Sequence, residues 1–158
     1  PSVFRVLANT VEQLGNAATG SITGILTVLV DGDDLEEPIA DAARGLLDGH
    51  IVLDRRLAER GHYPAVSVAR SISRVAREVT DAGQQQAAQK LRAILAVHAE
   101  TEDLIRIGAY VRGSSPQVDD AVELMPSVLD FLRQSPGEHV ALAETRARME
   151  KIASTWLF

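Results

Sequence analysis

The stretch that most constrains the fold is GSITGILTVLV, residues 20–30. β-Branched residues dominate it, and Ile25–Val30 is apolar except at Thr27. A nearly continuous apolar run, without alternating polar residues, is typical of a strand that is covered on both faces, as in a parallel sheet. We therefore expect residues 20–30 to form a buried strand.

Helical and strand patterns alternate around this stretch. Apolar residues at helical spacing predict one helix over 3–14 and another over 39–47. A second short apolar strand is expected over 50–53, and RRLAERG predicts a short helix that ends at Gly61. Strands that alternate with helices indicate an α/β sheet.

After about residue 76 the pattern is purely helical. Apolar spacing predicts helices over 87–95, over 104–111 and along 142–156, and Pro126 fits the first turn of one more helix. Glycine, serine and proline clusters separate these segments. This half contains no strand pattern and no internal repeat.

The predicted fold is therefore α/β followed by all-α, with a domain over 1–78 and a helical domain over 79–158. A chain of 158 residues with 46% apolar content can bury a core. Its net charge of -6, without a long basic block, argues against general binding to the nucleic-acid backbone. The absence of cysteine excludes disulfides and fits a reducing cytoplasm.

The motifs of a complete active site are missing from the sequence. No histidine has a second histidine at the helical spacing that a zinc site uses, so no metal site is expected. There is no phosphate-binding GxxxxGK[ST] loop and no GxSxG elbow. The acidic turn over 31–37 lacks the ligand spacing of a calcium loop. It is either a solvated loop or a contact for a basic partner.

One segment, HYPAVSVARSISRV at 62–75, combines an aromatic residue with arginines. Tyr63 is either a half-buried aromatic or a platform on which a nucleobase stacks. Arg70, Arg74 and Arg77 either form a solvated stripe or include one that reaches a phosphate, where a planar and permanently charged group suits a developing anion. Residue chemistry alone leaves both alternatives open.

A longer set of motifs extends around this segment in a fixed order. The chain reads GSIT, GDDLEEP, IADAARGLLDGHIVL, GHYPA and SISRV, and then RIGAYVRGS and FLRQ. In these motifs it closely resembles the type III protein-secretion ATPases, above all the flagellar export ATPase, and more distantly the catalytic β subunit of the rotary ATP synthase. The opening PSVF resembles the segment after the Walker B strand in that family. We therefore expect the chain to be a C-terminal fragment that lacks both Walker motifs.

The resemblance implies roles for five residues. Arg74, the arginine of SISR, would be the arginine finger that reaches the γ-phosphate bound by a neighbouring subunit. Tyr63 would pack on the adenine of its own subunit. Asp33, Asp34 and Glu37 would contact a central, stalk-like coiled-coil partner. No metal ligand is implied within the chain.

The resemblance also implies a fold and a function for the parent protein. The chain would hold the C-terminal part of a RecA-like nucleotide-binding domain, followed by a helical C-terminal domain. The full-length protein would be a homohexamer that hydrolyses Mg-ATP to drive protein export. Its partners would be a central stalk, the export gate, a peripheral stator-like regulator and chaperone–substrate complexes, at the cytoplasmic face of the inner membrane. The fragment alone is expected to be inactive and to bind no cofactor.

Three alternatives remain open at this point. The chain could derive from an ATP synthase or vacuolar-type catalytic subunit, although the GDDLEEPIADAARGLLDGHIVL motif favours the secretion branch. It could be a non-catalytic helical interaction module that keeps Arg74 for packing. A RecA-like nucleic-acid translocase is the third, and the acidic net charge argues against it.

Overall fold

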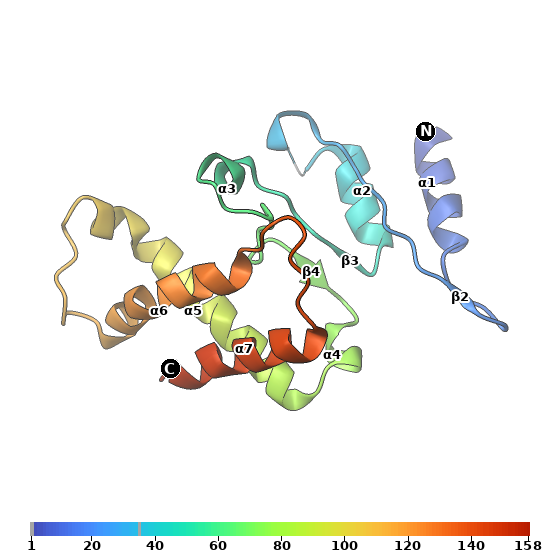
Figure 1. The fold of residues 1–158 in the computed structure, drawn as a ribbon. Helices are drawn as coiled ribbons and strands as arrows, with labels where there is room; N and C mark the ends of the chain where they lie inside the picture. Colours follow the sequence, from blue (N-terminus) through green and yellow to red (C-terminus); the bar gives the residue numbers. More distant parts are fainter. Residues whose placement is uncertain (1, 35) are drawn as a thin grey trace. The chain divides into compact units, whose positions relative to one another are not determined.

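The computed structural model describes residues 2–34 and 36–158, and Figure 1 shows their elements along the chain. Contacts divide the chain into two compact units, Pro1–His50 and Ile51–Phe158. Within the described residues no helix is long and apolar enough to cross a membrane. The division into 1–78 and 79–158, which follows the sequence pattern, stays a prediction.

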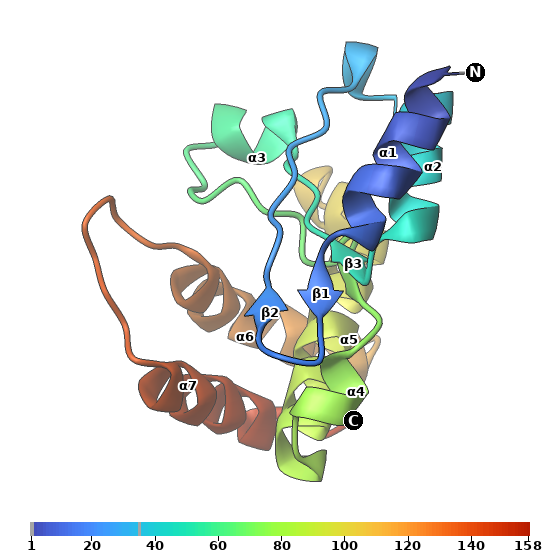
Figure 2. The same cartoon turned by 90° about the vertical axis from the view of Figure 1, so that its right-hand side faces the viewer.

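The first unit contains two helices and small amounts of other regular structure. Its elements are α1 (Ser2–Glu12), β1 (Gly15–Asn16), β2 (Ser21–Ile22), the 3-10 helix η1 (Asp31–Asp33), α2 (Pro38–Leu46) and β3 (Gly49–His50). Helices α1 and α2 contact each other, and β1 pairs antiparallel with β2 in a small hairpin (Figure 2). The helices predicted over 3–14 and 39–47 are confirmed.

The strand predicted over 20–30 is wrong in extent and in burial. Only Ser21–Ile22 is a strand, and residues 23–30 have no regular secondary structure. Ile25 is 93% exposed and Leu29 is 92% exposed. A central strand needs a hydrogen-bonded neighbour along each edge and side chains against each face. Within the described part of this unit, β1 supplies such a neighbour only along Ser21–Ile22.

The second unit begins with a layer of loops and short elements. These are α3 (Arg55–Glu59), β4 (Ile72–Ser73) and α4 (Ala76–Val79). The short helix predicted within RRLAERG is confirmed as α3. The strand predicted over 50–53 is confirmed only at its ends: His50 closes the two-residue strand β3, and Leu53 forms an isolated antiparallel bridge with Val66.

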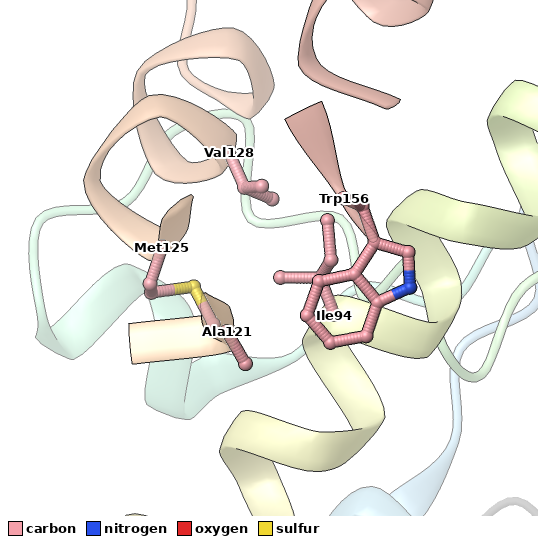
Figure 3. Close-up of a cluster of buried hydrophobic side chains, with 5 residues drawn as sticks. All are labelled: Ile94, Ala121, Met125, Val128 and Trp156. Atoms are coloured by element: carbon pink, nitrogen blue, oxygen red, sulfur yellow. The ribbon is translucent and has the colours of Figure 1, made fainter. Parts of the chain in front are cut away.

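Three longer helices form the rest of the second unit: α5 (Ala82–Arg106), α6 (Pro116–Leu132) and α7 (Leu142–Thr155). Helix α5 packs against both α6 and α7, and the three form one bundle (Figure 1). The largest cluster of buried side chains joins them: Ile94 of α5, Ala121, Met125 and Val128 of α6, and Trp156 after α7. Figure 3 shows the Trp156 ring beside Ile94 at the centre of this cluster.

Two of the predicted helices in this half have different boundaries in the structure. The helix predicted over 104–111 is wrong, since 104–106 complete α5 and the chain then turns at Gly108, which has a positive φ of 71°. Pro126 lies inside α6 and does not begin a helix. A proline within a helix removes one backbone hydrogen bond, but buried neighbours such as Met125 and Val128 hold this helix against the bundle. The last helix is confirmed as α7.

Candidate functional site

The candidate site lies on residues 54–75, which begin with Asp54, the N-cap of α3, and end just before α4. The Asp54 carboxylate accepts a hydrogen bond from the backbone N–H of Arg56 at 2.9 Å and another from Nη2 of Arg56 at 2.9 Å. An aspartate here satisfies an N–H group that has no partner within α3. The hydrogen bond from the Arg56 side chain lowers the pKa of Asp54 below its ordinary value. An aspartate just before RRLAE is an N-cap signal that could have been found in the sequence.

Tyr63 follows α3 in a loop that is held by its backbone. Its side chain is 56% exposed, and the Tyr63–Pro64 peptide bond is cis. The carbonyl oxygen of Tyr63 accepts a hydrogen bond of 2.9 Å from the N–H of Gln134, just after α6. An exposed aromatic ring on a fixed backbone can stack with a planar ligand ring. Nothing in the local sequence signals the contact with Gln134.

His62, beside Tyr63, anchors the same loop from within. It is only 4% exposed, and its N–H donates to the carbonyl of Leu57 at 2.9 Å. Burial lowers the pKa of His62, and the nearby charge of Arg133 lowers it further. The neutral imidazole is therefore the form that the folded protein favours at neutral pH.

After Tyr63, residues 65–71 lie alongside residues 52–54 before the chain reaches Arg74. The N–H of Asp54 donates to the carbonyl of Ala65 at 2.9 Å, and the N–H of Ser67 donates to the carbonyl of Val52 at 2.8 Å. The Ser71 hydroxyl accepts a hydrogen bond from the N–H of Val52 at 3.0 Å. Three bonds therefore fix the segment that carries the arginines.

Arg74 follows directly after β4 and is exposed. A guanidinium group in this position can donate several hydrogen bonds to a phosphate or carboxylate group of another molecule. Tyr63 and Arg74 belong to the same compact unit. Arg70 lies 3.9 Å from the Asp54 carboxylate, and Arg77 is exposed on α4, so neither shares the position of Arg74 at the end of a strand.

Sequence reasoning missed the residues of α5 that support this segment. Arg92 donates hydrogen bonds to the backbone carbonyls of Val68 and Ser71. Gln85 donates to the carbonyls of Arg77 and Thr80. The Arg92 contacts span 24 and 21 residues and the Gln85 contacts span 8 and 5, and all of them go to backbone carbonyls, so no motif marks them.

The acidic turn lies in the other compact unit. Asp34 is exposed, and its carboxylate accepts a hydrogen bond of 2.9 Å from the N–H of Glu36. Glu37 is half-buried and precedes α2, whose first turn begins with Pro38. Asp33 belongs to η1, but its side chain lies outside the described part of the structure. The turn thus presents Asp34 to solvent while a local bond shapes its backbone.

A metal site does not emerge from the described residues, where no group of three or more histidine, aspartate and glutamate side chains is close enough to hold an ion. What the segment 54–75 offers is an aromatic face and a guanidinium group. Both are suited to bind a ligand whose remaining contacts come from elsewhere.

Two family models match the chain, one on each side of α4. The nucleotide-binding domain of the ATP synthase alpha/beta family matches residues 1–73, and the C-terminal domain of the T3SS EscN ATPase matches residues 80–151. The first match covers Tyr63 and the segment through β4 and ends just before Arg74, and the second covers α5, α6 and most of α7.

Curated relatives align along nearly the whole chain. The flagellum-specific ATP synthase of Bacillus subtilis is 48% identical over 152 residues, which are 96% of this chain and 35% of that protein. The type 3 secretion system ATPase of Pseudomonas syringae pv. syringae is 47% identical over 98% of this chain and 34% of its own length. The chain therefore spans about a third of the length of the curated relatives it matches.

Solved structures agree with these alignments. The assembled ATPase EscN of the enteropathogenic E. coli type III secretion system superposes with a TM-score of 0.93 and 38% identity, over 97% of this chain and 37% of that chain. EscN in complex with its central stalk EscO gives a TM-score of 0.86. The motifs, the two family models and this fold agree: along nearly its whole length the chain is similar to type III secretion and flagellar export ATPases.

Proposed function

We propose that this chain is the C-terminal part of an ATPase that drives protein export through a flagellar or related type III secretion apparatus. The parent protein would act as a homohexamer at the cytoplasmic face of the inner membrane. The names of its relatives support the activity, and the assembled state of EscN supports the oligomer. An ATP synthase subunit, NeqB, shares the fold at only 23% identity, so sequence similarity favours the secretion branch over the ATP synthase alternative.

The observation that carries this proposal is the setting of Arg74. It lies at the end of a strand, is exposed, and follows a segment that hydrogen bonds hold to residues 52–54. An arginine finger needs this combination, because it must reach a phosphoryl group on another subunit while its own backbone stays fixed. Arg74 would stabilise the charge that develops on the γ-phosphoryl group during hydrolysis.

Tyr63 would bind the adenine of the ATP held by its own subunit. Its exposed ring provides a stacking face, and its backbone is fixed to the segment after α6. One chain would then contribute to two nucleotides, its own through Tyr63 and that of its neighbour through Arg74.

Magnesium is not assigned to this chain. The described residues contain no cluster of three potential ligands, and the sequence contains no phosphate-binding loop. We expect the magnesium ligands, the phosphate-binding lysine and the catalytic glutamate on other parts of the parent protein. This part would supply adenine packing and the finger, and alone would neither bind Mg-ATP nor hydrolyse it.

The acidic turn is proposed as a contact for the central stalk. Asp34 is exposed and Glu37, three residues further on, is half-buried. Asp33 is included on the basis of the sequence alone, because its side chain lies outside the described part of the structure. Carboxylates on a turn favour a partner with a basic surface. EscN is known in complex with its central stalk EscO, which supports a stalk partner here as well. The export gate, a stator-like regulator and chaperone–substrate complexes are further partners that the family resemblance suggests.

The test places Arg74→Ala in the full-length protein and measures ATP turnover together with oligomer mass. Loss of a finger should lower kcat by roughly 10³–10⁵-fold, and assembly should persist. Arg77→Ala is the matched control, since Arg77 is an exposed arginine on the neighbouring helix α4 and should leave turnover unchanged. Undiminished turnover in Arg74→Ala would remove the finger assignment and with it the main support for the proposal.

A further inference from the structure

Arg92 of α5 makes a two-pronged contact with the segment that leads to Arg74. One terminal nitrogen, Nη1, donates to the carbonyl of Val68 at 2.9 Å, and the other, Nη2, donates to the carbonyl of Ser71 at 3.2 Å. A guanidinium group holds its two terminal nitrogens at a fixed spacing in one plane, so it can bridge two carbonyls in a way that a lysine cannot.

The bonds from Arg92 attach to a small turn over residues 67–71, which is also bonded on its other side. The carbonyl of Ser67 accepts hydrogen bonds from the N–H groups of Arg70 at 3.2 Å and Ser71 at 3.1 Å. The Ser71 hydroxyl also donates to this carbonyl at 2.7 Å, while it accepts from the N–H of Val52. The turn is thus fixed to residues 52–54 on one side, and Arg92 fixes it to α5 on the other.

Helix α5 also holds the chain on the far side of Arg74. Nε2 of Gln85 donates to the carbonyl of Arg77 at 3.0 Å and to the carbonyl of Thr80 at 2.8 Å. Asp81 caps α5 itself, by accepting from the N–H of Gln84 at 2.8 Å. Side chains from one helix therefore clamp the backbone both before and after Arg74.

We propose that Arg92 is a positioning residue for Arg74, and that α5 is the base on which the finger is set. This inference rests on the proposed role of Arg74. In this proposal Arg92 does not contact a nucleotide. It acts by fixing the carbonyls of Val68 and Ser71, and the chain continues from Ser71 through β4 to Arg74. The core residues Leu91 and Ile94, on the same turns of α5, fix the helix in the bundle. The packing of the helical bundle would then decide where the finger stands.

The inference predicts a kinetic defect that is specific to the finger. Displacement of a catalytic group by about 1 Å can cost on the order of 10²-fold in rate, so Arg92→Met in the full-length protein should lower kcat by roughly 10–100-fold. The KM for ATP should stay within about twofold, because a finger acts on the transition state of the neighbour's nucleotide and not on ground-state binding. Arg92→Lys should be intermediate, since it keeps the charge and loses the fork.

The decisive measurement is a double-mutant cycle. If Arg92 acts through Arg74, then Arg92→Met should have no further effect on kcat in an Arg74→Ala background. Arg106→Met serves as the matched control, because Arg106 is on the same helix but bonds to Asp103 of that helix at 2.7 Å, and it should leave kcat unchanged. Oligomer mass and thermal midpoint are measured for every variant.

The outcomes separate the two proposals. An unchanged kcat in Arg74→Ala contradicts the finger itself. A large effect of Arg74→Ala together with an unchanged kcat in Arg92→Met, or with equal effects of Arg92→Met in both backgrounds, contradicts only the role of Arg92. If Arg92→Met fails to assemble, the same cycle is run with Arg92→Lys, and an effect that persists in the Arg74→Ala background again overturns the inference.

Discussion

The two compact units of this chain treat apolar residues in opposite ways. In the second unit, Ile94 and Val128 are completely buried and Trp156 is 2% exposed. In the first, Ile25 and Leu29 belong to the nearly continuous apolar run Ile25–Val30, yet each is more than 90% exposed. A helix satisfies its own backbone and needs only a partner for one face, whereas a strand needs neighbours for its backbone as well.

The difference teaches that an apolar pattern predicts a helix more safely than a strand. Helices α5, α6 and α7 pack against one another within the chain. Residues 23–30 pair with no strand among the described residues of their unit.

The sharpest way to break this comparison uses two isoleucines. Ile94→Ala should lower the free energy of unfolding of the second unit by about 2–5 kcal/mol, through lost burial and the cavity that remains. Ile25→Ala in the isolated chain should change it by less than about 0.5 kcal/mol, because its side chain is 93% exposed. Urea unfolding followed by circular dichroism measures both. Equal effects would show that residues 23–30 are packed in solution.

A smaller difference is expected between two aspartates whose carboxylates each accept a backbone N–H two residues on. Asp54→Ala should cost about 1–2 kcal/mol, since the carboxylate caps α3 and also binds the Arg56 side chain. Asp34→Ala should lower the free energy of unfolding by only about a few tenths of a kcal/mol, because Asp34 shapes an exposed turn. The midpoints of thermal unfolding compare the two, and a larger loss for Asp34→Ala would contradict the comparison.

Two glycines should respond with opposite signs. Gly61 ends α3 with a positive φ of 68°, so Gly61→Ala should destabilise the second unit by about 1 kcal/mol. Gly45 lies in the last turns of α2 with open space around its α-carbon. Gly45→Ala should stabilise that helix by up to about 1 kcal/mol. Hydrogen exchange of the amides in α2 and α3 reports each helix separately, and effects of the same sign would refute this prediction.

The smallest effect concerns pH and His62. Its pKa is lowered in the folded state, so the unfolded state binds the proton more readily. Stability from this residue is complete above the unfolded pKa of about 6.5 and falls as the pH drops below it towards the folded value. His62→Gln should flatten the dependence of unfolding free energy on pH between about 7 and 5. His139→Gln, at an exposed position, should keep the slope of the parent, and an unchanged slope in His62→Gln would contradict the assignment.

Sequence patterns predicted the helical elements well, with local errors that have physical causes. Helices α1, α2, α3 and α7 follow from apolar spacing and caps. The boundary errors at 104–111 and at Pro126 arise where a long helix continues through a local breaker or stops at a glycine with positive φ. At Pro126 contacts across the bundle outweigh the local preference, whereas near Gly108 the local preference of the glycine ends the helix.

The candidate site was predictable only in part. Tyr63 and Arg74 were named through the family motifs, and their roles remain proposals. Asp54 carried a local signal. Arg92, Gln85 and Gln134 could not be found, because each acts by hydrogen bonds to backbone atoms of residues that the fold brings near.

The bond from the N–H of Gln134 to the carbonyl of Tyr63 carries a consequence for comparative sequence work. Both partners are main-chain atoms, so nearly any amino acid at either position preserves the bond. Substitution scans and residue covariation will therefore be silent about it. Only proline at position 134 lacks the N–H donor and would break this bond. The link between the end of α6 and the loop that carries Tyr63 therefore depends on backbone geometry and not on residue identity.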